Sequence, residues 1–142
     1  MTARLNRFSD LVKEARSCQI CPRMADQKAI LSSANGSINA DLLFVAEAPG
    51  RHGAAKTGIP FQGDRSSINF EKLLKHIELF RQDVFITNAV LCNPLKDGNN
   101  DKPTRKEISN CSYFLKGVID LVKPKVIATL GGTALDALNS IL

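Results

Sequence analysis

Four cysteines are the residues whose type and spacing point most directly to chemistry in this chain. Cys18 and Cys21 form a C-x-x-C pair, whereas Cys92 and Cys111 stand alone. Four thiolates around one centre suit zinc or an iron–sulfur cluster, and the spacing does not choose between the two. Separate roles also stay open, because Cys92 and Cys111 fit apolar core positions and a C-x-x-C pair can be a redox dithiol. Thioredoxin-type pairs follow a strand, however, whereas this pair follows a predicted helix.

A second group of chemically useful residues lies where apolar runs end. The run "LLFVA" at 42–46 is followed directly by Glu47 and a turn, "APG". In open α/β sheets, ligands bind at the carboxyl ends of the strands, where such turns occur. The stretches "TNAVLCNP" at 87–94 and "LGGTA" at 130–134 end two further runs. The chain has no Walker loop and no G-x-G-x-x-G, so the sequence does not indicate an NTP or dinucleotide site.

Strands and helices alternate along the chain. Apolar spacing predicts helices over about 5–15 and 68–80, and a third that begins at the capping box of Thr104 and Glu107. The runs at 40–46, 83–92 and 124–132 are predicted strands, and 133–142 begins another helix. Two loops, 47–64 and 93–103, separate these elements. This order predicts an α/β fold, a three-layer α/β/α sandwich with a mostly parallel central sheet.

Composition limits the class of protein. With 142 residues, 44% hydrophobic and 23% charged, the chain fits one globular domain over residues 1–142. A net charge of +5 mildly favours a polyanionic partner, although the basic residues are scattered along the sequence. The sequence has no apolar run long enough to span a bilayer and no secretory signal. We therefore expect a cytoplasmic protein without a membrane partner, and a monomer.

Taken in order, six pieces of the sequence resemble the family-4 uracil-DNA glycosylases, which are iron–sulfur enzymes. They are the C-x-x-C pair, "AEAPG" at 46–50, "GIPFQG" at 58–63, "TNAVLCNP", the helix cysteine and "LGGTA". The resemblance covers essentially the whole chain. It implies a base-excision repair enzyme that hydrolyses the N-glycosidic bond of uracil in DNA, with uracil-containing DNA as its partner and a three-layer α/β/α fold.

The resemblance also implies roles for individual residues. Glu47, Ala48 and Pro49 would form a wall of the uracil pocket, with Glu47 as the catalytic residue. Phe61 would stack on the extruded base, and Asn88 would hydrogen-bond its Watson–Crick edge. These residue types suit the task, because an amide offers a donor beside an acceptor and an aromatic face holds a planar base.

For the cysteines, the resemblance replaces the open choice of metal with a [4Fe–4S] cluster. Its ligands would be Cys18, Cys21, Cys92 and Cys111. Two other functions remain as alternatives: a non-catalytic iron–sulfur module that binds nucleic acid, and a small iron–sulfur redox protein.

The chain departs from the family pattern in three respects. Ala46 stands where the family usually has glycine, and Arg51 and His52 stand where acidic residues are frequent. Relative to the family, the domain is also incomplete at its C-terminal side, where a further strand, a histidine-containing catalytic loop and a groove loop are expected. The two histidines, His52 and His76, do not match that motif, so we expect residues 1–142 alone to cleave uracil-containing DNA poorly. His76 is expected on the solvent side of its helix, and His52 in the pocket loop.

Overall fold

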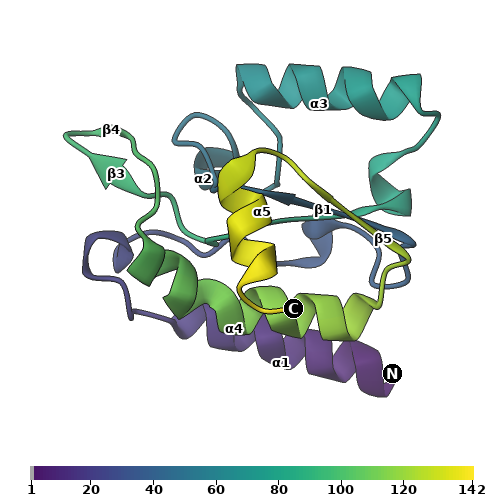
Figure 1. Cartoon of the computed structure of the whole chain (residues 1–142), viewed down its shortest axis with the longest axis horizontal. Coiled ribbons are helices and arrows are strands. Elements are labelled where there is room, and N and C mark those ends of the chain that lie inside the picture. The colour runs from purple at the N-terminus through teal and green to yellow at the C-terminus, as the bar shows by residue number, and fades with distance from the viewer. Residues whose placement is uncertain (1) are drawn as a thin grey trace.

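The computed structural model describes residues 2–142 as a parallel sheet with helices on both of its faces (Figure 1). Three strands build this sheet, and two very short ones form a separate hairpin. In chain order the elements are α1 (Ala3–Ser17), β1 (Leu42–Ala46), α2 (Ala54–Thr57), α3 (Arg65–His76), β2 (Phe85–Asn88), β3 (Leu95–Lys96), β4 (Asn99–Asn100), α4 (Arg105–Val122), β5 (Val126–Thr129) and α5 (Gly132–Asn139). Three single 3₁₀ turns cover Pro22–Met24, Ser33–Asn35 and Arg81–Asp83.

The main sheet has the strand order β2–β1–β5, and both pairings are parallel. In the register, Ala46 lies opposite Asn88, and Val45 lies opposite Thr129. All three strands therefore end at the same edge of the sheet. The predicted α/β class with a mostly parallel central sheet is confirmed.

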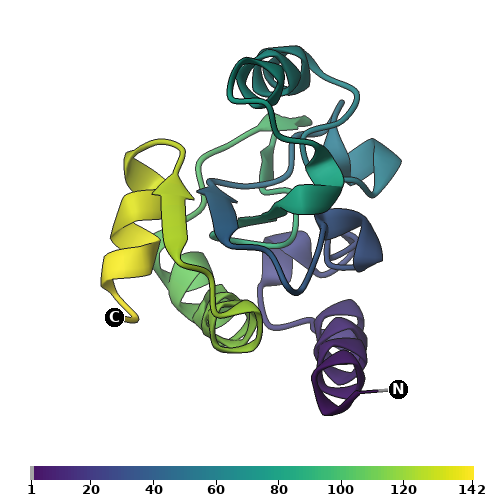
Figure 2. The same cartoon turned by 90° about the vertical axis from the view of Figure 1, so that its right-hand side faces the viewer.

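Each face of the sheet has its own hydrophobic core. Leu43, Val45 and Phe85 point into the larger core, which α1 and α4 cover. Phe44 and Ile86 belong to a smaller core on the opposite face, beneath α3. Figure 2 shows this division, with α3 on one side of the strands and α1 with α4 on the other. Successive side chains of a strand point to opposite faces, so β1 is buried on both sides as a central parallel strand requires.

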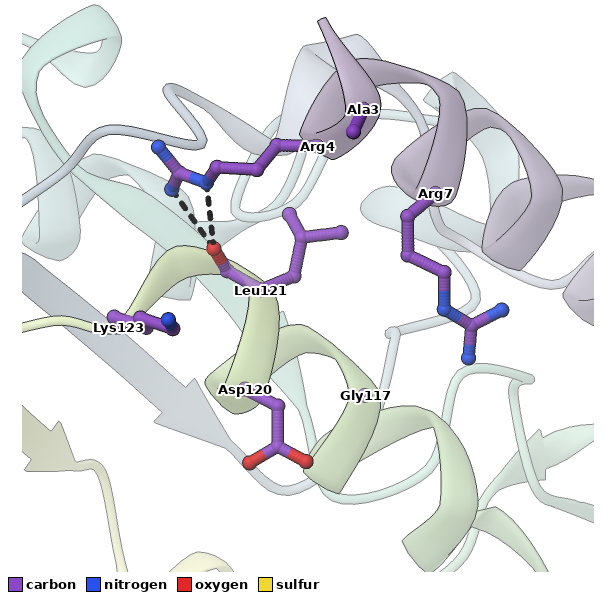
Figure 3. Close-up of a pocket in the computed structure, with 7 residues that line it drawn as sticks. All are labelled: Ala3, Arg4, Arg7, Gly117, Asp120, Leu121 and Lys123. Atoms are coloured by element: carbon purple, nitrogen blue, oxygen red, sulfur yellow. Dashed lines mark hydrogen bonds between the residues drawn. The ribbon is translucent and has the colours of Figure 1, made fainter.

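Helices α1 and α4 pack side by side along the larger core, and Arg4 ties their ends together. Its guanidinium donates two hydrogen bonds to the Leu121 carbonyl, at 3.2 Å from Nε and 2.8 Å from Nη2 (Figure 3). Such bonds satisfy carbonyls that the last turn of a helix leaves without partners.

Within residues 2–142, no helix combines the length and the apolar character that crossing a membrane needs.

Short-range sequence signals set the helix starts. The predicted capping box is confirmed, since the Thr104 hydroxyl accepts from the Glu107 N–H at 3.1 Å and the Glu107 carboxylate accepts from the Thr104 N–H at 2.8 Å. Asp64 caps α3 in the same way, accepting from the Ser67 N–H at 3.0 Å. Both caps lie directly before the helices that flank the sheet.

The structure corrects several details of the predicted elements. Helix α3 begins at Arg65 because of the Asp64 cap and ends at His76, so the predicted helix over 68–80 is shifted. Leu73 and Ile77 share the apolar spacing of Phe70 and Leu74, which predicts that they lie on the same side, yet they are 39% and 42% exposed, because α3 buries only a narrow stripe against β1 and β2. The strands are shorter than predicted, and the two loops contain α2 and the β3–β4 hairpin.

The tight contact between α1 and α4 gives a stability prediction. Leu11 is fully buried, and its side-chain methyls are the nearest atoms to the space that a Cβ on Gly117 would occupy. Leu11→Ala should lower the free energy of unfolding by about 2–5 kcal/mol, because it leaves a cavity between the helices. Leu5 of the same helix is 42% exposed, so Leu5→Ala should change the free energy of unfolding by no more than about 0.5 kcal/mol. Urea denaturation of wild type and of the two variants measures both changes. Equal losses of unfolding free energy in the two variants would contradict the packing described.

Candidate active site and cysteine cluster

A pocket of about 340 Å³ opens at the carboxyl edge of the sheet. Its lining combines the ends of β1 and β2, the loop after β1, the start of α3, the last residue of β4 and the residue that follows β5: Ala46, Glu47, Ala48, Pro49, Gly50, Ala54, Phe61, Asp64, Ser66, Asn88, Asn100 and Leu130. All five residues predicted to bind the substrate are among them. The structure therefore brings together residues that are up to 41 positions apart in the sequence, from Glu47 to Asn88.

Glu47 and Asn88 reach the pocket because the strands are held in register beyond their ends. The Ala89 N–H donates to the Ala46 carbonyl at 2.8 Å, and the Val90 N–H donates to the Glu47 carbonyl at 3.3 Å. Asn88 is buried, with 6% of its surface exposed, whereas Glu47 is half-buried. Among residues 2–142, neither the Asn88 amide nor the Glu47 carboxylate has a hydrogen-bonding partner. Both groups are thus available to a ligand.

Phe61 has an unusual backbone and a firmly supported ring. Its φ of 51° lies in the left-handed region, which non-glycine residues seldom adopt. Its ring stacks on Phe70, with the centroids 4.5 Å apart and the planes 16° from parallel. Arg81 holds the same turn by donating to the carbonyls of Pro60 and, at 3.2 Å, of Phe61. The turn therefore presents a half-buried aromatic ring at the pocket wall.

Two glycines let the loop after β1 pack against Asp64. A Cβ on Gly53 would lie 2.3 Å from the Asp64 Oδ2 atom, and one on Gly50 would lie 2.9 Å from it. A Cβ at either position would force the Asp64 carboxylate to move, so glycine at both positions allows this close packing. Asp64 lines the pocket although the sequence analysis did not single it out. Its position before a helix with a D-x-x-S pattern was the available signal.

The four cysteines gather beside the pocket edge, at the corner where α1, the end of β2 and α4 meet. Cys21 and Cys111 are buried, and Cys18 and Cys92 are half-buried. The pKa of Cys92 is raised to about 12, chiefly by burial and then by repulsion between its charged form and the three other thiols. Burial likewise raises the pKa of Cys111 to about 11, against a hydrogen bond from Leu91 that lowers it.

The donor set at this corner consists of sulfur, with little else nearby. The Asn110 amide donates to the Cys21 sulfur at 3.4 Å. Across the part of the chain that the structure describes, no three His, Cys, Asp or Glu side chains are arranged so that they could hold a metal ion. The structure thus gathers the four predicted ligands without forming a closed ion site, and it leaves metal binding by the chain unestablished.

Arg23, two residues after Cys21, links the cysteine corner to the hairpin and to α4. Its guanidinium donates to both carboxylate oxygens of Glu107, each at 2.8 Å, and to Asp101 at 2.6 Å. These hydrogen bonds hold the pKa of Glu107 and that of Asp101 below their usual ranges. Further bonds run from Arg23 to the carbonyls of Leu95 and Lys102. Sequence reasoning missed this network because its members are distant along the chain.

The comparison with known proteins agrees with this geometry. A profile of the uracil DNA glycosylase superfamily matches residues 34–141, a range that contains every residue of the pocket. The chain belongs to the uracil DNA glycosylase superfamily. The resemblance drawn from the six sequence pieces is thereby confirmed at the level of the superfamily.

Individual members of the superfamily align over most of the chain. A type-4 uracil-DNA glycosylase of Thermotoga maritima is 35% identical over 127 residues, covering 89% of this chain and 63% of the relative. One from Archaeoglobus fulgidus is 36% identical over 124 residues, covering 87% and 59%. A type-5 uracil-DNA glycosylase of Pyrobaculum aerophilum is 30% identical over 163 aligned positions, covering 95% and 70%. The chain spans about three-fifths of the length of the two type-4 relatives.

The two histidines lie outside this superfamily pocket. His52 is exposed on the loop after β1, and His76 is exposed at the end of α3, as expected for a solvent-side residue. Neither is among the residues that line the pocket. The structure instead adds Asp64, Ser66 and Asn100 to the polar groups that the sequence predicted there.

The Arg23 network predicts a pH-dependent stability. Because the pKa of Glu107 is lowered in the folded protein, its contribution is present above the ordinary pKa of a glutamate and is lost as the pH falls through the lowered value. Glu107→Gln should lower the free energy of unfolding at neutral pH by roughly 1–3 kcal/mol. The difference from wild type should shrink as the solution is acidified through that range.

Urea denaturation between neutral and acidic pH measures this effect. Asp120 provides the control, because it pairs with Lys116 on the same helix with 63% of its side chain exposed. Asp120→Asn should cost no more than about 1 kcal/mol at any pH. A Glu107→Gln penalty that does not depend on pH would assign the effect to packing instead of charge.

Proposed function

We propose that this chain carries the base-recognition pocket of an enzyme that hydrolyses the N-glycosidic bond of uracil in DNA. The observation that carries the proposal is the convergence of Glu47, Phe61 and Asn88 on one pocket in a member of this superfamily. The names of its relatives as uracil-DNA glycosylases support the same substrate. A cytoplasmic location remains part of the proposal.

The pocket residues divide the work of recognition. An enzyme that acts on a base must take it out of the helix and read it in a pocket. Phe61, supported from behind by Phe70, would hold the extruded ring by stacking. The Asn88 amide has a donor and an acceptor side by side, which match N3–H and O4 of uracil; cytosine reverses this pattern. Because Asn88 is buried without a protein partner, a base that satisfies it is favoured over one that does not.

The chemical step needs stabilisation of two opposite charges. Cleavage of the bond between N1 and the sugar leaves the electron pair on uracil and a cationic deoxyribose, and water then adds to the sugar. The Glu47 carboxylate, which has no partner among residues 2–142, would stabilise the cation or position that water. The N–H groups of Ala48 and Gly50, for which residues 2–142 supply no acceptor, would donate to the leaving anion.

The cysteine corner fits a [4Fe–4S] cluster by the chemistry of its donors. Four cysteines and no other ligand type is the usual set for such a cluster, and Cys18, Cys21, Cys92 and Cys111 would hold it. Three thiols act on the pKa of Cys92, which supports their lying close together. The bound cluster would supply a covalent link between the end of α1, the segment after β2 and α4.

The pocket predicts base selectivity that single substitutions remove. The chain should bind uracil in preference to cytosine, and Asn88→Asp should weaken uracil binding because it replaces the donor with an acceptor. Phe61→Ala should cost on the order of 1–3 kcal/mol of base binding. Phe80→Ala is the matched control, because Phe80 is 69% exposed and outside the pocket. Titration followed by NMR measures the affinities, and equal binding by all four proteins would overturn the pocket assignment.

Two further variants separate an enzyme from a module that only binds. Release of uracil from a single-stranded oligonucleotide, measured in single turnover with protein in excess, should fall by ~10²-fold or more in Glu47→Gln. Glu78→Gln, an exposed carboxylate at the end of α3, should leave the rate unchanged. Selective uracil binding with no release by wild type would support the non-catalytic alternative for this chain.

The proposed cluster makes a separate prediction. Protein purified without oxygen should be brown and contain iron, and Cys92→Ala should lose colour and stability together, because a group bound only by the folded state stabilises folding. Iron and sulfide analysis and thermal unfolding measure this. Stoichiometric zinc without iron would overturn it.

A further inference from the structure

We propose that Asn100, the last residue of β4, is a further nucleotide-binding residue of the pocket. Its side-chain N–H would donate to an acceptor oxygen on the mouth side of the extruded nucleotide. The inference deepens the proposed function and rests on it. Asn100 lines the same pocket as Glu47, Phe61 and Asn88 although it comes from a separate two-stranded sheet.

The hydrogen bonds around Asn100 fix which way its amide points. One atom of the amide receives two donors, the Arg51 backbone N–H at 2.9 Å and the Asn93 Nδ2 group at 3.1 Å. Only the oxygen of an amide accepts hydrogen bonds, so this atom is Oδ1. The Nδ2 group then points the other way, and no acceptor for it is found within residues 2–142. The loop after β1 lies on that side, since a Cβ on Gly50 would lie 3.7 Å from Nδ2.

The hairpin is held against the pocket loop by a small network. Asn93, with 2% of its surface exposed, donates to the Pro49 carbonyl at 2.6 Å as well as to Asn100. The Arg51 guanidinium donates to the Gly98 carbonyl at 2.7 Å, so the loop after β1 also binds the turn of the hairpin. Because a buried amide donates to both partners, the position of Asn100 is set by the loop that carries Glu47. The donor is therefore placed before any ligand arrives.

Burial separates the two amides of the pocket. Asn88 is buried at the sheet end, whereas Asn100 is exposed at the rim. An extruded base remains attached to the DNA backbone, so it enters with its glycosidic nitrogen N1 toward the mouth and its N3 and O4 edge inward. The inner amide then meets N3–H and O4. The outer one lies on the side of O2 and of the sugar–phosphate oxygens.

A neutral donor suits this position. Two carboxylates, Glu47 and Asp64, line the same pocket, so a phosphate or leaving anion there experiences repulsion. An amide N–H stabilises an oxygen that carries partial or developing negative charge without neutralising the carboxylate that the sugar cation needs. The partner of the Asn100 N–H is an acceptor oxygen of the nucleotide, either O2 of the base or an oxygen of the DNA backbone.

The test compares Asn100→Ala with Asn99→Ala. Asn99 is the adjacent residue of the same hairpin, and its amide donates only within the turn, to the Asp97 carbonyl at 3.4 Å. Each protein is titrated by NMR with uracil, 2-thiouracil, 4-thiouracil and a uracil-containing single-stranded oligonucleotide. Replacing an oxygen with sulfur weakens the acceptor at one known position. Thermal unfolding confirms that both variants are folded.

We expect Asn100→Ala to weaken binding by roughly 2- to 10-fold and Asn99→Ala to leave it unchanged. If the acceptor is O2, free uracil is affected, and the wild-type preference for uracil over 2-thiouracil disappears in Asn100→Ala. If it is a backbone oxygen, only the oligonucleotide is affected. In either case the preference for uracil over 4-thiouracil persists, which shows that the inner part of the pocket is intact.

A second variant tests the role of Asn100 without changing Asn100 itself. Asn93→Asp removes the donor that holds Asn100, so it should reproduce the loss seen in Asn100→Ala. Unchanged binding of all ligands by Asn100→Ala, with Asn88→Ala still losing uracil, would overturn the role of Asn100 and leave the proposed function standing. Absence of selective uracil binding by the wild-type chain would overturn both.

Discussion

The parallel pairing of β1 with β2 is the constraint on which the candidate site depends. It places Ala46 opposite Asn88, and two further backbone bonds keep the chains together past the last paired residues. A shift of one residue would turn every side chain of β2 to the other face. The two cores oppose such a shift, because Phe85 fills the core beneath α1 and α4 while Ile86 fills the core beneath α3. The relative position of Glu47 and Asn88 is therefore fixed by packing on both faces of the sheet.

The segment that follows β2 connects the pocket to the cysteine corner. Only three residues separate Asn88 from Cys92, and Val90 and Leu91 among them are buried. The Leu91 carbonyl accepts from the Ile30 N–H at 2.8 Å, which ties the segment to the chain that follows the C-x-x-C pair. Asn93 then reaches back to the loop after β1. Any group bound by the cysteines would thus stiffen the floor of the pocket through a short and buried stretch of backbone.

Sequence reasoning succeeded where a local signal reports a structural necessity. Alternating elements, the box of Thr104 and Glu107, and polar residues directly after apolar runs all predicted features that the structure has. It failed where position depends on contacts between distant segments. Asn100 lies in a stretch with a polar and flexible composition, and its place in the pocket depends on bonds to Arg51 and Asn93. Apolar residues at helical spacing overstated the buried face of α3, because spacing gives a direction and not the width of the surface that covers it.

The two carboxylates of the pocket are not equivalent, and their surroundings separate their roles. Asp64 Oδ1 accepts from the Ser67 N–H at 3.0 Å and from the Ser67 hydroxyl at 2.6 Å, so this side chain is committed to starting α3. Its Oδ2 side lies against Gly50 and Gly53, which leaves little space for a ligand there. Glu47 has neither a cap to satisfy nor a cation beside it within the described residues. A carboxylate held by two donors is committed to the fold, whereas one without donors among the described residues is free to face a cation that forms in front of it. In the reaction that we propose, the geometry therefore favours Glu47 over Asp64 as the group that acts on the sugar.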